Sequence, residues 1–203
     1  MHALVLQCGG PTAVVNTSLA AVVRRWRASM PGGVLSGGHH GLRALFTADW
    51  RTLTDAGDGW LAALDETPGM ALGGGRDRLS KPDVEQAVGL LAARGVEMLF
   101  LIGGNGTMAA GRGLAACAAR ARVPLRIIGV PKTIDNDVPH TDVCPGFPSA
   151  ARFLRACAAG QYVRTCSSAA PVPMCLSSIG SLLQWPEEPP FPPRCQVKTE
   201  TPS

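Results

Sequence analysis

Short apolar runs alternate with longer amphipathic segments over the first 160 residues of the chain. The runs HALVLQ, EMLFLIGG and PLRIIGV are almost continuously apolar and end near glycine or proline, a pattern typical of buried strands, and GGVLSGG predicts one more strand. Between these runs, the spacing of apolar positions predicts helices over 13–28, 55–64, 81–94, 106–122 and 147–158. The alternation predicts an α/β protein with a Rossmann-like parallel sheet and helices on both faces.

The predicted helix at 81–94 has the clearest boundary signals. Ser80 is suited to cap its first turn, Pro82 is tolerated inside that turn, and Gly95 can end the helix. These signals set the helix ends independently of the apolar pattern.

The composition changes near Gly160. Residues 160–203 contain eight prolines and show no apolar periodicity. Proline lacks a backbone donor and clashes inside a helix, so this segment cannot form an interior strand or helix. We therefore expect a folded domain at 1–159 and a Pro/Cys-rich tail at 160–203 that is disordered or translated in a wrong frame.

Charge and cysteine content bound the class of protein. The net charge is +4, and the Lys and Arg residues are scattered, which argues against nucleic acid as a partner. No stretch approaches the length of a membrane span, and the N-terminus lacks a signal-peptide pattern. The seven cysteines include no C-x-x-C pair, so we expect reduced thiols and a cytoplasmic location.

Three stretches of the chain are rich in glycine: CGGPT at Cys8, GGGRDRL at Gly73 and GGNGT at Gly103. The first and third follow a predicted strand and open a predicted helix, an arrangement that aims N–H groups at a phosphate, although a plain tight turn is the alternative. The chain has no P-loop motif. GNGTMA fits the looser dinucleotide fingerprint, but the acid expected after RIIGV is missing, which disfavours a nicotinamide cofactor.

The segment PKTIDNDVP, at 131–139, follows the last predicted strand and combines a lysine, a threonine and two aspartates. One carboxylate could accept a proton from a hydroxyl nucleophile while the other holds a divalent ion. Lys132 could neutralise charge on a transferring phosphoryl group, and Thr133 could bond a phosphate. An Asx-rich turn between two prolines is the alternative interpretation.

Five motifs occur in the order and spacing of the phosphofructokinase family: GGPTAVVN, ALGGGRDRL, IGGNGTM, GVPKTIDNDVPHTD and PGFPSAARF. Residues 2–159 resemble the amino-terminal part of such an enzyme. The resemblance implies a two-domain α/β fold and a glycolytic kinase, which transfers a phosphoryl group from ATP or pyrophosphate to the 1-hydroxyl of fructose 6-phosphate. It also implies Mg²⁺ as cofactor and, for a full-length chain, a homo-oligomer.

The resemblance also implies roles for individual residues. Asp135 matches the general base and Lys132 accompanies it in catalysis, while Thr133 and Ile134 match the loop that holds the sugar. Asp137 matches an acid that organises the metal. The remaining matches are to donor-binding positions: Gly10, Arg76, Asp77, Gly104, Asn105, Gly106 and Thr107.

The chain departs from the family pattern in its donor loop. Asn105 stands where many relatives have a magnesium-binding aspartate, although some pyrophosphate users also carry asparagine. Gly106 resembles ATP users, whereas Lys132 resembles pyrophosphate users. Because a small residue leaves room for a nucleoside, we favour ATP as the donor and keep pyrophosphate as the alternative.

Relatives continue well beyond this length and supply a sugar-binding motif and a second lobe. We therefore expect a truncated fold that lacks most of the second domain, with weak or no activity as this short chain. A non-catalytic, nucleotide-binding fragment is the alternative function.

Overall fold

The computed structural model describes residues 1–167. The chain divides into two compact units, 1–150 and 151–203, and helix α6 (Phe147–Ser167) crosses the division. This helix runs further than the predicted 147–158. The predicted tail lies mostly outside the described residues, so the domain boundary after residue 159 stays a prediction.

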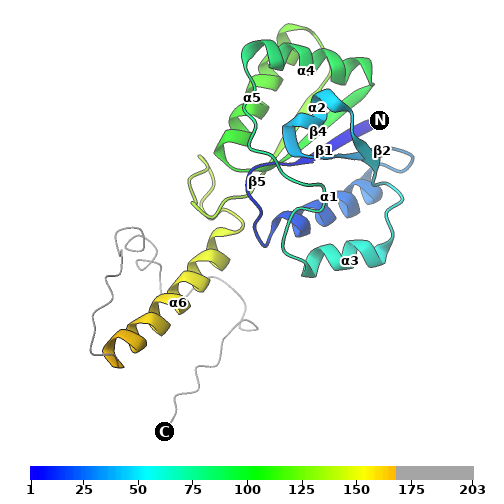
Figure 1. The fold of residues 1–203 in the computed structure, drawn as a ribbon. Helices are drawn as coiled ribbons and strands as arrows, with labels where there is room; N and C mark the ends of the chain where they lie inside the picture. Colours follow the sequence, from blue (N-terminus) through cyan, green and yellow to red (C-terminus); the bar gives the residue numbers. More distant parts are fainter. Residues whose placement is uncertain (168–203) are drawn as a thin grey trace. The chain divides into compact units, whose positions relative to one another are not determined.

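A five-stranded sheet forms the centre of the first unit (Figure 1). Its strands are β1 (His2–Gln7), β2 (Val34–Gly38), β3 (Trp50–Thr52), β4 (Val96–Gly103) and β5 (Arg126–Pro131), in the order β3-β2-β1-β4-β5. All neighbours are parallel except β3, which pairs antiparallel with β2. The predicted parallel sheet is confirmed. Strand β3 was not predicted, because three residues are too few to show an alternating pattern.

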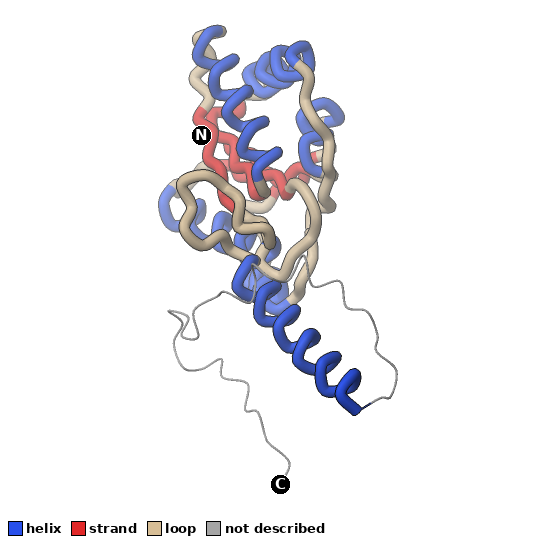
Figure 2. Tube along the Cα trace, turned by 90° about the vertical axis from the view of Figure 1, so that its left-hand side faces the viewer, coloured by secondary structure: helices blue, strands red, loops and turns tan. Residues whose placement is uncertain are grey.

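Helices cover both faces of the sheet, as predicted (Figures 1 and 2). Leu4 and Leu6 of β1 pack with α4 (Lys81–Ala93), α5 (Asn105–Arg120) and the short α2 (Ala44–Thr47), which follows a 3₁₀ turn. Ala3 and Val5 point to the other face and pack with α1 (Val15–Ser29) and α3 (Asp58–Glu66). Successive side chains of a strand alternate between faces, so a continuously apolar β1 can fill both cores.

The predicted boundaries of α4 are confirmed. The Ser80 hydroxyl accepts a hydrogen bond from the Asp83 N–H, and the Asp83 carboxylate accepts one from the Ser80 N–H, which completes a capping box. Gly95 follows the helix with φ +67°, a conformation that glycine adopts without strain.

The prediction that the PLRIIGV strand is buried was wrong. Strand β5 pairs only with β4 among the described residues, and its Ile128 is 40% exposed. An apolar run cannot by itself distinguish a central strand from an edge strand, because both have apolar positions. No helix in the described part of the chain has the length and apolar character needed to cross a bilayer.

Candidate active site

Three loops meet at the carboxyl edge of the sheet because β1, β4 and β5 are parallel neighbours. The Cys8 N–H donates to the Ile102 carbonyl at 2.8 Å, which ties the turn after β1 to the end of β4. The Lys132 N–H donates to the Gly103 carbonyl at 2.9 Å, which ties the loop after β5 to the same strand end. The two glycine turns and the PKTIDNDVP loop are therefore adjacent, as parallel topology requires.

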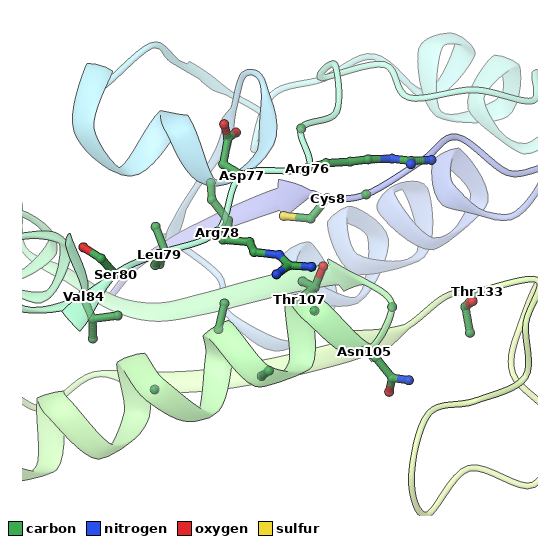
Figure 3. A pocket seen from close by; sticks show the side chains of 18 of the residues that line it. Cys8, Arg76, Asp77, Arg78, Leu79, Ser80, Val84, Asn105, Thr107 and Thr133 are labelled. Atoms are coloured by element: carbon green, nitrogen blue, oxygen red, sulfur yellow. The ribbon is translucent and has the colours of Figure 1, made fainter. Parts of the chain in front are cut away.

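A cavity of about 1280 Å³ opens between these loops, the 75–81 segment and the facing sides of α4 and α5 (Figure 3). Among the predicted site residues, Ile134 does not line it, and its side chain is 47% exposed. The other predicted site residues all line the cavity: Gly10, Arg76, Asp77, Gly104, Asn105, Gly106, Thr107, Lys132, Thr133, Asp135 and Asp137. The structure thus brings the predicted residues together, while their individual roles stay predictions.

The first turn of α5 forms one wall of the cavity. Gly104 precedes the helix in an extended conformation and has no side chain with which to cap the helix's first backbone N–H groups. No acidic residue lies in this first turn. Free N–H groups and the positive end of the helix dipole make the Gly104–Thr107 turn suited to an anion. Thr107 is itself buried and packs so close to Gly103 that a side chain on Gly103 would overlap it.

Lys132 is a buried lysine, only 4% exposed, at the centre of the three loops. Its ammonium donates to the Gly10 carbonyl at 2.6 Å, so it joins the β5 loop to the turn after β1. Burial lowers the pKa of Lys132, because desolvation disfavours the charged form. Burial also raises the pKa of the neighbouring Cys8 thiol to about 12, and the Lys132 charge opposes that shift only in part.

The loop after β5 is both an Asx-rich turn and part of the cavity wall. Asn136 adopts φ +53°, its side-chain oxygen accepts from the Cys144 N–H at 2.7 Å, and its amide donates to the Asp142 carbonyl. Thr133 donates to the Asp135 carboxylate at 3.3 Å and accepts from the Asp135 N–H at 3.1 Å. The two interpretations of this segment are thus compatible, since the turn presents Asp135 to the cavity.

Asn105, at the start of α5, connects this helix to the loop after β5. Its amide donates to the Asp137 carbonyl at 2.8 Å, a bond that an aspartate at 105 could not make. The described residues contain no cluster of three His, Cys, Asp or Glu side chains able to hold a metal. Mg²⁺ is, however, commonly bound by one or two carboxylates plus substrate phosphates, and Asp135 and Asp137 both line the cavity. The residues therefore fit a magnesium ion that the donor phosphates share.

A buried polar network behind the cavity was missed by the sequence analysis. Gln7 is fully buried; its side-chain oxygen accepts from the Leu72 N–H, and its amide donates to the Asn16 side chain. Asn16 in turn accepts from the Ala71 N–H and donates to the Thr67 carbonyl. The network fastens the 67–72 segment to β1 and α1. Its only sequence signal is a pair of polar positions within otherwise apolar stretches.

The 73–78 glycine–arginine segment continues from this anchored stretch. The Gly9 N–H donates to the Gly75 carbonyl at 2.8 Å, which holds the segment beside the turn after β1. Figure 3 shows the Arg76 side chain extended past Cys8. It ends close to Gly10, since a Cβ added to Gly10 would lie 3.1 Å from one of its terminal nitrogens. Arg78, Lys81 and Arg120 also line the cavity, although the sequence analysis gave them no role.

Fold and cavity together define a doubly wound α/β domain with its main cavity at the carboxyl edge of the sheet, the edge at which proteins of this class bind ligands. The chain belongs to the phosphofructokinase family: the family model described as "Phosphofructokinase" matches residues 2–172. This match confirms the family resemblance and extends past residue 159.

Relatives agree with this assignment. The chain is 37% identical over 154 residues to a sulfofructose kinase of Alkalicoccus urumqiensis, covering 76% of this chain and 39% of that protein. It is 38% identical over 151 residues to the pyrophosphate–fructose 6-phosphate 1-phosphotransferase of Rhodospirillum rubrum, covering 74% and 37%. The solved structure of a pyrophosphate-dependent phosphofructokinase from Nitrosospira multiformis matches with a TM-score of 0.75 and 30% identity, covering 83% of this chain and 43% of that one. The chain thus spans about two fifths of the length of these relatives.

Proposed function

We propose that this chain forms the donor half of a phosphotransferase site that moves a phosphoryl group from ATP to the 1-hydroxyl of fructose 6-phosphate. One observation carries the proposal: a single cavity is lined both by the Gly104–Thr107 turn, which suits phosphates, and by Asp135, which suits a proton acceptor. The relatives' names support the same class of reaction.

The chain's own residues divide into those for the donor and those for the acceptor. The N–H groups at the start of α5 bind donor phosphates, and Lys132 and Arg76 offset their negative charge. Asp135 accepts the proton of the sugar hydroxyl, and its bond with Thr133 fixes the orientation of its carboxylate. Asp137 would hold Mg²⁺ together with the donor phosphates, and the ion would neutralise part of the phosphate charge.

The space around Gly106 supports ATP as the donor. A Cβ added at Gly106 would meet no atom of the described residues within 4 Å, so the space beside this glycine is open. The cavity continues along a face of α5 built from Ala109, Ala110, Gly113 and Ala116. Small side chains there leave a groove with room for a nucleoside, which a pyrophosphate donor would not need.

Pyrophosphate is the second candidate donor. The buried Lys132 favours it, because the Gly10 carbonyl holds its ammonium at the turn after β1, and relatives with pyrophosphate in their names match most of this chain. The sulfofructose kinase relative also makes a sulfonated fructose a second candidate acceptor.

A coupled assay with purified full chain and Mg²⁺ tests the proposal. Fructose 6-phosphate is supplied with ATP and, separately, with pyrophosphate, and sulfofructose replaces the sugar in a third reaction. We expect at most weak turnover with ATP from this short chain, and we expect an Asp135→Asn variant to lose at least 100-fold of whatever turnover is measured, since a positioned base contributes at least that factor. The variant also controls for contaminating host enzyme.

The outcomes separate the candidates. Faster turnover with pyrophosphate than with ATP would favour the second donor. Donor binding without turnover, measured by calorimetry on the same preparation, would support the non-catalytic nucleotide-binding fragment. Equal rates for the Asp135→Asn variant and the wild type would contradict the role of Asp135 as the base.

A further inference from the structure

We propose that Arg78 binds the donor phosphates together with the first turn of α5, and is thus a second donor-binding arginine in addition to Arg76. The proposal rests on the proposed function, because it requires a phosphorylated donor in this cavity. It assigns a role to a residue that the motif comparison left without one.

The position of Arg78 is the first argument. Figure 3 shows its guanidinium extended from the 75–81 segment towards Thr107, in the first turn of α5. Arg76 runs in a different direction, past Cys8 and next to Gly10. The two arginines therefore serve different parts of the cavity, and Arg78 is the one directed at the helix N-terminus.

The second argument is that Arg78 has no internal partner. Arg24 pairs with Asp65, Arg27 pairs with Asp58, and Arg94 donates to the Leu45 carbonyl. Within the described residues, Arg78 makes no such ion pair or hydrogen bond. The adjacent Asp77 projects to the opposite side of the segment in Figure 3. The guanidinium donors thus remain available to a ligand in the cavity.

The third argument is that the backbone around Arg78 is anchored on both sides. Before Arg78, the Gly75 carbonyl accepts a hydrogen bond from the Gly9 N–H, and the Leu72 N–H donates one to the side chain of the buried Gln7. After it, Ser80 closes the capping box of α4. A residue on an anchored backbone loses less conformational freedom on binding, so its contacts contribute more to affinity.

The chemistry of the two groups is complementary to one anion. A guanidinium presents a planar fork of N–H donors that matches phosphate oxygens, and a helix N-terminus presents backbone N–H groups and a partial positive charge. Both face the same end of the cavity, and no acidic residue in the first turn of α5 competes for them. Because phosphates are common to ATP and pyrophosphate, Arg78 should contribute to the binding of either donor.

The test is equilibrium binding of Mg·ATP and of Mg·pyrophosphate to the full chain by calorimetry at fixed ionic strength. We expect Arg78→Gln to weaken donor binding about tenfold or more, as loss of a charge-assisted bidentate contact does. Arg25→Gln is the matched control, since Arg25 is an exposed arginine on α1 outside the cavity. Arg78→Lys keeps the charge without the fork, and we expect its affinity to lie between those of Arg78→Gln and the wild type.

Each result has a defined meaning. If the wild type binds donor and Arg78→Gln binds it with the same affinity, the proposed role of Arg78 is overturned. The proposed function is then left intact. Absence of donor binding to the wild type would overturn both. Equal weakening by Arg78→Gln and Arg25→Gln would mean that only net charge matters, and would also overturn the assignment. Arg78 is exposed, so its variants should melt at the wild-type temperature.

Discussion

Cys8 and Lys132 show how burial sets the chemistry of single residues at this site. The Cys8 thiol is 1% exposed, and burial raises its pKa from 9.0 to about 12, even with the Lys132 ammonium nearby. The thiol is therefore neutral in the folded protein at physiological pH. Lys132 shifts in the opposite direction, because burial disfavours its charge.

The raised thiol pKa predicts a loss of stability in alkali. Above pH 9 the unfolded chain releases the Cys8 proton while the folded chain retains it, so the unfolded state binds fewer protons and the free energy of unfolding falls as pH rises. We expect a loss of about 1 kcal/mol between pH 8 and pH 10 from this group. Cys8→Ala should not show this loss of stability with pH. The alanine leaves a cavity, but the free-energy cost of that cavity does not depend on pH.

Urea unfolding of the two proteins at several pH values measures this difference. Other titrating groups, including Lys132, are present in both proteins and largely cancel in the comparison. A stability difference between the wild type and Cys8→Ala that stays constant from pH 8 to pH 10 would contradict the shifted pKa.

At the scale of elements, side-chain hydrogen bonds from β1 and α1 hold a long connection in place. The connection from α3 to α4 includes the anchored 67–72 stretch and the arginine segment that follows it. Its backbone N–H groups at Ala71 and Leu72 are satisfied by Asn16 and Gln7, respectively. Buried donors left without partners cost far more than a typical hydrogen bond contributes, so this network fixes the path of the connection.

Replacing Gln7 with leucine should destabilise the protein by about 2–4 kcal/mol, because the Leu72 N–H and the Asn16 side chain lose their buried partner. Gln86→Leu on the exposed face of α4 is the matched control, and we expect it to stay within about 0.5 kcal/mol of the wild type. Urea midpoints and slopes give both values. Equal effects of the two substitutions would show that the network contributes little.

The exposure of strand β5 depends on its position in the sheet and not on its sequence alone. Its sequence resembles that of a central strand, yet among the described residues it lies at the sheet's edge with Ile128 partly exposed. Its role at the site is to carry the 131–139 loop to the same edge as the glycine turns.

At the scale of the whole molecule, the cavity is built from segments that lie far apart in sequence. Residues from 8 to 137 line it, all within the first compact unit. A ligand that binds only this assembled state stabilises the entire unit, because unfolding any contributing segment releases it.

We therefore expect Mg·ATP at 100 times its dissociation constant to raise the free energy of unfolding by about 2.7 kcal/mol. For a chain of this size the melting temperature should rise by about 5–10 °C. Asp135→Asn should keep this rise, because the role proposed for Asp135 is at the acceptor, whereas Arg78→Gln, with binding weakened about tenfold, should lose about half of it at the same ligand concentration. A thermal melt followed by circular dichroism measures all three, and a rise of equal size in Arg78→Gln would count against its contact with phosphate.

The sequence alone determined the class of fold, the family and eleven of the residues that line the cavity. Strand and helix periodicities depend only on neighbours a few residues away, and so do the Ser80 cap and the glycine turns. These features can therefore be predicted from short stretches of sequence. The PKTIDNDVP motif likewise carries its chemistry within nine residues. Parallel topology then placed these turns at one edge by a general rule.

Only the tertiary structure decided which side chains face one another. The bonds of Gln7 to Leu72 and of Lys132 to Gly10 join residues 65 and 122 positions apart, and no local pattern encodes such pairings. The exposure of β5 and the different directions of Arg76 and Arg78 likewise depend on packing between distant segments. Local periodicity predicts most of the helices and strands, whereas long-range packing decides which of their residues meet at one site.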